Sequence, residues 1–202
     1  MPLRFAFLYV FLLSFVLCNA QSYRSRSSFE KKWAILHPFA AIKTRSIYKK
    51  ITPIYNEVKD SKKLDEFENG GKLDAYRHVL YMAAFSQKIK PRKVKKLGVA
   101  HEKGNYKNFL NSVNEHGEIP DSLSTVMDLY NNSVGLEIGK IHKRISYTDL
   151  SALVINEIIA EKAVYFKRDS LGNYLNCEGR TIDLKQFHKQ WFVPKCMVNY
   201  KR

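Results

Sequence analysis

Three short polar clusters lie inside apolar, helix-like stretches of the chain, and their side chains are those of acid–base and metal sites. The clusters are Asp74-x-x-Arg77-His78, His101-Glu102 and Asp128-x-x-Asn131-Asn132-x-x-Gly135. Burying charged groups among apolar side chains is costly unless they pair, hydrogen-bond or bind a metal. We therefore expect the three clusters to converge on one polar site inside a helical core.

Imidazole and carboxylate groups are the common protein ligands of divalent metals. The predicted ligands are His78, His101, Glu102 and Asp128. Such a set suits Zn²⁺, Mn²⁺ or Fe²⁺, and a bound metal could activate water for hydrolysis. Because the histidines must be neutral to bind, metal affinity is expected to fall below about pH 6.5.

The polar residues around the metal are predicted to carry the catalysis. This predicted set is Asp74, Arg77, His78, Glu102, Asn131 and Asn132. Arg77 could hold a phosphate or another anion, and either asparagine could complete the coordination shell or hold a water. In the alternative interpretation the same groups form a buried structural network, with Glu102 paired to Arg77. Three other histidines are expected in surface or local-packing positions: His37, His116 and His188.

The elements that must position these residues are helices, because the apolar residues recur at helical spacing. We predict an all-α fold, a single helical domain of residues 27–168 with about six helices. Their expected ranges are about 28–36, 38–58, 72–87, 91–102, 122–143 and 150–166. Ser27 and Glu30 form a capping box, Pro53 is expected to kink the second helix, and residues 105–120 are predicted to be a surface loop.

Helical spacing also predicts which polar side chains share a face. Asp74 and His78 lie four residues apart and therefore point the same way. Asp128 falls on a stripe with Gly135 and Gly139. Each glycine inside a helix costs roughly 1 kcal/mol relative to alanine. Such glycines are expected where another backbone or a ligand comes close.

In this order, the three motifs resemble a bacterial domain family of unknown function. Its pattern is an Arg-His helix, a His-Glu pair and a Met-Asp-x-x-Asn-Asn-x-x-Gly helix, found here over 74–78, 101–102 and 127–135. The resemblance covers about residues 69–139 and implies an all-helical domain in bacterial, often exported, proteins. It supplies no activity. The arrangement is also similar to metal phosphohydrolases with a paired His-Asp motif, although Glu102 stands at the second position here.

The first twenty residues have the features of a secretory signal peptide. Arg4 precedes an apolar run over 5–17, and small residues place the cleavage site near Ala20-Gln21. The run is shorter than the ~20 residues needed to span a bilayer, and no later transmembrane segment is expected. We predict export to a periplasmic or extracellular location. Acylation of Cys18 as a lipoprotein anchor is the alternative.

Cys177 and Cys196 remain after cleavage, and such a pair in an exported chain usually forms a disulfide. We predict a disulfide-stapled C-terminal tail over 169–202 that is irregular or holds a hairpin. The alternative is half of a metal site with His188.

The chain is strongly basic, with 34 Lys and Arg against 19 Asp and Glu and a net charge of +15. This balance favours anionic partners such as a phosphodiester, a phospholipid or an envelope polymer. The densest basic run, over 88–96, is either a solvated helix face or a binding patch. It carries no aromatic residue, which disfavours single-stranded nucleic acid.

The sequence thus indicates an exported hydrolase acting on an anionic substrate. The alternative is a non-enzymatic exported protein that binds anionic envelope material.

Overall fold

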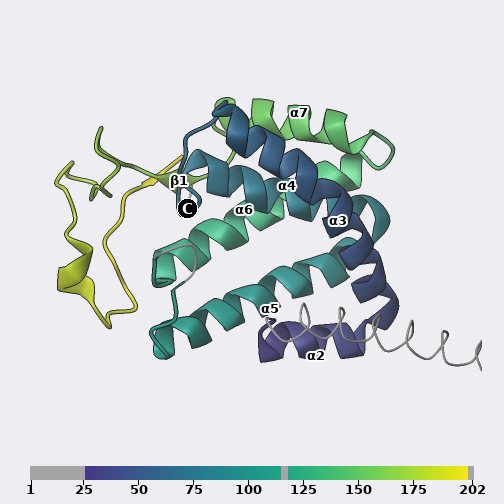
Figure 1. Ribbon diagram of the computed structural model, residues 1–202, viewed down its shortest axis with the longest axis horizontal. Coiled ribbons are helices and arrows are strands. Elements are labelled where there is room, and N and C mark those ends of the chain that lie inside the picture. The colour runs from purple at the N-terminus through teal and green to yellow at the C-terminus, as the bar shows by residue number, and fades with distance from the viewer. Residues whose placement is uncertain (1–25, 115–117, 200–202) are drawn as a thin grey trace, which may run out of the picture.

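The computed structural model describes residues 26–114 and 118–199. In these ranges the chain forms six α-helices and one small two-stranded sheet (Figure 1). The helices are α2 (Ser28–Leu36), α3 (Pro38–Ser61), α4 (Lys72–Lys88), α5 (Pro91–Leu110), α6 (Ser122–Ile141) and α7 (Tyr147–Ile159). The predicted all-α class with about six helices is confirmed. The predicted signal peptide and His116 lie outside the described residues.

Helix α4 is the centre of the fold. It contacts α3, α5, α6 and α7, and Figure 1 shows it enclosed by neighbouring helices. Its apolar residues occur on nearly every face, and Tyr76, Val79 and Leu80 are fully buried. The polar residues of α4 are therefore held inside the domain. No helix of the described residues is long and apolar enough to cross a membrane.

Helices α4 and α6 pack backbone to backbone at two glycines. A Cβ atom at Gly139 would meet the Ala83 carbonyl oxygen and the Ser86 hydroxyl, and one at Gly135 would meet the Val79 carbonyl oxygen. The glycine stripe predicted to face a backbone or a ligand thus faces the backbone of α4. This close approach brings the polar residues of α6 against those of α4.

The helix starts follow local capping chemistry. The predicted Ser27–Glu30 capping box is present at α2. The Asp121 carboxylate accepts from two backbone N–H groups at the start of α6. At α4, the Asp65 carboxylate accepts from the backbone N–H groups of Lys72 and Leu73 at 2.6 and 3.0 Å. These caps fix the residues at which α4 and α6 begin. They therefore also fix how deeply the polar side chains of the two helices are buried in the domain.

Two predicted boundaries are wrong. Helix α5 continues to Leu110, so the first part of the predicted 105–120 loop is helical. Tyr106 and Phe109 extend it because their rings pack on Trp191 of the tail, at centroid distances of 5.0 and 4.8 Å. Helix α7 ends at Ile159 rather than at residue 166. Shortly after it the backbone turns through a left-handed residue, Glu161 (φ 58°). Helix α3 runs without interruption through Pro53.

The C-terminal tail is irregular and is tied to the helices at both ends. Strand β1 (Tyr165–Phe166) pairs antiparallel with β2 (Met197–Val198), and the short 3₁₀-helix η1 covers Leu184–Phe187. The predicted Cys177–Cys196 disulfide is confirmed. A second small core packs the tail on the start of α6 and contains Met127, Val164, Phe166, Tyr174, Ile182 and Val193.

Candidate metal centre

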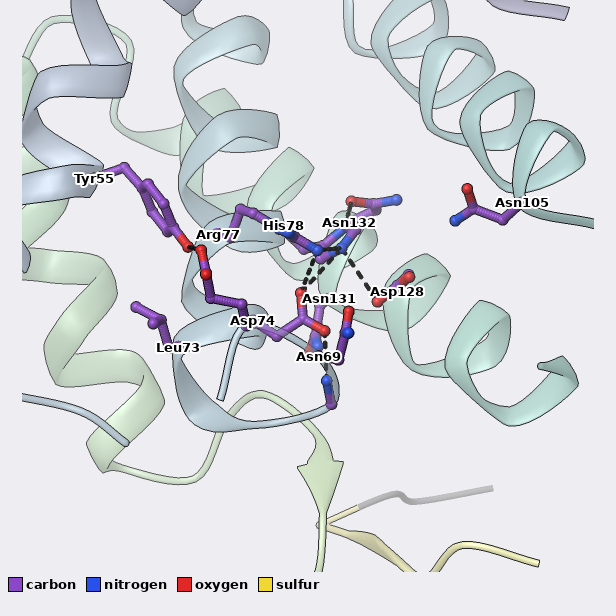
Figure 2. Close-up of polar contacts among 12 residues, drawn as sticks. Tyr55, Asn69, Leu73, Asp74, Arg77, His78, Asn105, Asp128, Asn131 and Asn132 are labelled. Atoms are coloured by element: carbon purple, nitrogen blue, oxygen red, sulfur yellow. Dashed lines mark hydrogen bonds and ion pairs between the residues drawn. The ribbon is translucent and has the colours of Figure 1, made fainter. Parts of the chain in front are cut away.

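Three buried side chains from two helices form a compact group of metal-ligating atoms. Asp74 and His78 come from successive turns of α4, and Asp128 comes from α6. One ligand atom from each lies within 4.8 Å of the others. The His78 Nε2 atom is 3.2 Å from Asp128 Oδ1 and 3.5 Å from Asp74 Oδ1 (Figure 2). We call this group the Asp–His–Asp cluster.

Neighbouring donors hold the α4 carboxylate in place. The Gly70 backbone N–H donates to Asp74 Oδ2 at 2.6 Å. The Arg77 guanidinium donates from Nη2 to Asp74 Oδ1, also at 2.6 Å. Gly70 can approach because it adopts a left-handed conformation (φ 66°), which glycine tolerates without strain. These two donors therefore orient the Asp74 carboxylate before any ligand binds.

The orientation of His78 is set by Asn132. The His78 Nδ1 atom lies 3.2 Å from Asn132 Oδ1, and Figure 2 shows this contact on the far side of the ring from the carboxylates. A carbonyl oxygen only accepts, so Nδ1 carries the proton. The Nε2 lone pair of His78 thus faces Asp74 and Asp128, with Arg77 Nη2 also 3.5 Å from this atom. Second-shell partners commonly hold a metal-binding histidine in this way.

Burial lowers the pKa of His78 to about 4, although the nearby Asp74 carboxylate opposes the shift. The imidazole is therefore neutral at neutral pH. The onset of protonation near pH 6.5, expected from the unperturbed value, does not apply to this side chain.

Burial also raises the pKa of Asp128 well above its usual value, and the charges of Glu102 and Asp74 raise it further. Asp128 Oδ1 accepts no hydrogen bond within the described part of the chain. A carboxylate oxygen and a histidine lone pair repel each other unless a cation or a proton lies between them. The raised pKa shows that a proton is held here readily, and a divalent metal could take its place.

Two of the predicted ligands lie outside the Asp–His–Asp cluster. His101 Nδ1 is 3.6 Å from Glu30 Oε1 on α2. Burial raises the pKa of Glu30, but its hydrogen bonds and charge interaction with His101 and Ser27 outweigh this and lower it to about 2. Glu102 is buried, and its Oε2 accepts from Asn105 Nδ2 at 3.2 Å. Of the four predicted ligands the structure brings together His78 and Asp128, and the third member is Asp74.

The two adjacent asparagines of α6 have different positions. Asn132 faces His78, whereas Asn131 is fully buried on the side of the tail. Asn131 Nδ2 donates to the Val164 carbonyl at 2.9 Å, and Asn131 Oδ1 accepts from the Val164 N–H at 3.0 Å. The side chain pairs with the backbone as a neighbouring strand would. Asn131 thus joins α6 to the segment that leads into the tail.

A small, partly open cavity of about 30 Å³ borders Asp74, Arg77 and Asp128. A space of this size admits an ion or about one or two waters. Glu118, which also lines it, accepts from the Tyr174 hydroxyl at 2.8 Å and lies 3.7 Å from the buried ammonium of Lys195. These wall residues were not predicted from the sequence, because loop and tail residues have no periodicity to mark them.

The other predicted surface residues are placed as follows. His37 is partly buried and stacks edge-on with Trp33 at 5.6 Å, and His188 is exposed. In the basic run over 88–96, five of the six cationic side chains are exposed and Lys93 is partly buried, as a solvated helix face requires.

Comparison with known proteins identifies the family to which the chain belongs. The model of a domain of unknown function, DUF6973, matches residues 31–162. No curated protein and no solved structure matches the chain. The match extends well beyond residues 69–139 and spans more than half of the chain. The chain therefore belongs to the DUF6973 family of unknown function.

Proposed function

We propose that this protein is an exported, divalent-metal-dependent hydrolase that acts on an anionic substrate. The observation that carries the proposal is the buried Asp–His–Asp cluster, with one neutral imidazole directed at two carboxylates. Three protein ligands leave coordination positions for water and substrate, as in catalytic rather than structural metal sites. Zn²⁺, Mn²⁺ and Fe²⁺ all accept this mixture of nitrogen and oxygen ligands.

Each residue of the site has a role in this proposal. When bound, the metal would act as a Lewis acid and lower the pKa of water. Arg77, anchored on Asp74, is positioned to bind an anionic group beside the metal. Asn132 keeps the His78 ring in its ligating orientation. Glu102, oriented by Asn105, is the proposed proton acceptor.

The substrate class follows from charge and size. The net charge of +15 attracts anions such as phosphodiesters, phospholipids or envelope polymers. The small cavity admits the reacting group only, so the rest of the substrate must lie on the surface. The disulfide is typical of oxidising compartments and supports the proposed export.

One observation favours a second candidate, in which the protein is not an enzyme. Arg77 already neutralises Asp74 at 2.6 Å, and a proton between His78 and Asp128 would complete the network without a metal. The cluster would then serve stability, and the basic surface would bind anionic envelope material.

Hydrolysis by metal-depleted and metal-restored protein distinguishes the two candidates. The substrates are an activated phosphodiester, bis(p-nitrophenyl) phosphate, and phosphatidylglycerol vesicles. We expect activity that disappears with a chelator, returns with Zn²⁺, Mn²⁺ or Fe²⁺, and is absent from a folded His78→Ala variant. His188→Ala is the matched control, because it removes an exposed histidine of the tail. If the wild type hydrolyses neither substrate with any of the three metals, and His78→Ala only lowers the thermal midpoint, the second candidate holds.

A further inference from the structure

The corner at which α2 meets α3 exposes a cluster of large apolar side chains, which we call the apolar corner. Its members are Ile35 (70% exposed), Leu36 (63%), Phe39 (80%) and Ile42 (68%). Single exposed apolar residues are ordinary, but four within one short segment form a patch of the kind found at interaction sites. The apolar corner is therefore expected to be covered by a binding partner.

The charges around the apolar corner have one sign. Residues 31–56 contain no Asp and no Glu. The exposed cations of this segment are Lys32, Lys43, Arg45, Lys49 and Lys50. A segment that combines exposed apolar side chains with cations, and has no acid, is typical of helices that lie in the interface of an anionic membrane. A second copy of the chain would bring the same positive charges together and be repelled.

The corner is also held firmly on the domain. Trp33 is buried beneath it, and its indole N–H donates to the Lys93 carbonyl at 2.9 Å. Phe39 and Ile42 lie three residues apart on α3 and therefore share a face. Figure 1 shows the corner at the opposite end of the molecule from the C-terminal tail. A surface docked at the corner would thus leave the tail in solvent.

From these observations we infer that the apolar corner inserts into the surface of an anionic phospholipid bilayer, with the flanking cations against the lipid headgroups. The inference does not depend on the proposed hydrolase. Its test measures binding alone, so failure of one leaves the other standing.

A tryptophan placed at the corner reports insertion directly. In the full chain, Phe39→Trp should show an emission blue-shift with phosphatidylglycerol vesicles and none with phosphatidylcholine vesicles, after subtraction of the wild-type spectrum. Leu171→Trp is the matched control, since Leu171 is similarly exposed (86%, against 80% for Phe39) but lies in the tail. Its emission should not change. The inference is overturned by an unshifted Phe39→Trp spectrum, by equal shifts in both lipids, or by an equal shift of the control.

Charge removal tests the electrostatic half of the inference. With about 1 kcal/mol per cation near an anionic bilayer, Lys43→Gln combined with Arg45→Gln should weaken vesicle binding about 30-fold. The control pair is Lys185→Gln with Lys189→Gln, two exposed lysines of the tail, and should bind as the wild type does. Equal loss in both pairs would show only nonspecific attraction. A concentration-dependent shift of the Phe39→Trp variant without vesicles would identify a second copy as the partner. Either result overturns the inference.

Discussion

Replacing Asn131 with alanine is expected to destabilise the fold strongly while leaving the metal centre intact. The side chain satisfies both the N–H and the carbonyl of Val164, a residue that is itself fully buried. Alanine would leave both groups without a partner. Each buried unsatisfied group costs about 1–3 kcal/mol, so we expect a loss of about 4 kcal/mol in the free energy of unfolding.

The neighbouring Asn132 supplies the matched comparison. Asn132→Ala removes one hydrogen bond, the 3.2 Å interaction with His78 Nδ1, and should cost only about 1 kcal/mol. Because the His78 ring would lose its orienting partner, metal affinity should fall about 10- to 100-fold. Urea unfolding followed by circular dichroism measures the stability of both variants, and calorimetric titration measures their metal affinity.

The two asparagines do not have these separate roles if their variants exchange these behaviours. A stable Asn131→Ala variant that has lost metal affinity would show that this residue belongs to the site. An Asn132→Ala variant with full affinity would show that the amide does not orient His78. A changed urea m-value in either variant would mean that the unfolded state was altered and that the comparison must be repeated in another background.

Three further predictions concern the frame around the site. The pKa of Glu30 falls to about 2 in the fold, so its contribution of about 3 kcal/mol is present above pH 4.5 and is lost as the pH falls towards 2. Urea midpoints of Glu30→Gln and wild type should therefore differ at pH 7 and converge only as the pH approaches 2, and a gap independent of pH would refute this. Gly139→Ala would drive a methyl group into the Ala83 carbonyl and should lower the free energy of unfolding by about 2–3 kcal/mol. A neutral or stabilising result in thermal unfolding would mean that α4 and α6 can move apart. Reduction of the Cys177–Cys196 bridge should cost about 3 kcal/mol, and equal thermal midpoints with and without reductant would contradict the loop-entropy argument.

Much of the helical frame was predictable because its signals are local. The capping box at Ser27, the proline at the start of α5 and the apolar period of α4 are all readable within a few residues. The wrong boundaries depend on distant partners. The last turns of α5 are stabilised by Trp191, and residues 165–166 form a strand because 197–198 lie beside them. No local pattern carries that information.

The candidate site was predictable where helical spacing decides it. Asp74 and His78 share a face of α4 at a spacing of four, and Asp128 shares a stripe with Asn132 on α6. Adjacent residues on a helix point about 100° apart, and tertiary contacts decide which of the two faces a centre. In the structure His101 pairs with Glu30 and Glu102 with Asn105, and the two asparagines likewise have different partners. The residues that line the cavity from the loop and the tail are brought there by the tertiary fold, so no local pattern predicts them.

The central claim is that Asp74, His78 and Asp128 bind one divalent metal ion. Calorimetric titration of metal-depleted protein with Zn²⁺, Mn²⁺ and Fe²⁺, in buffers of different ionisation enthalpy, tests it most directly. We predict that at least one metal binds with a stoichiometry of one ion per chain and, below the raised pKa of Asp128, releases about one proton. The isosteric Asp128→Asn variant should lose this binding while staying folded. If the wild type binds none of the three metals stoichiometrically, or if Asp128→Asn binds with unchanged affinity, the cluster is not a metal centre.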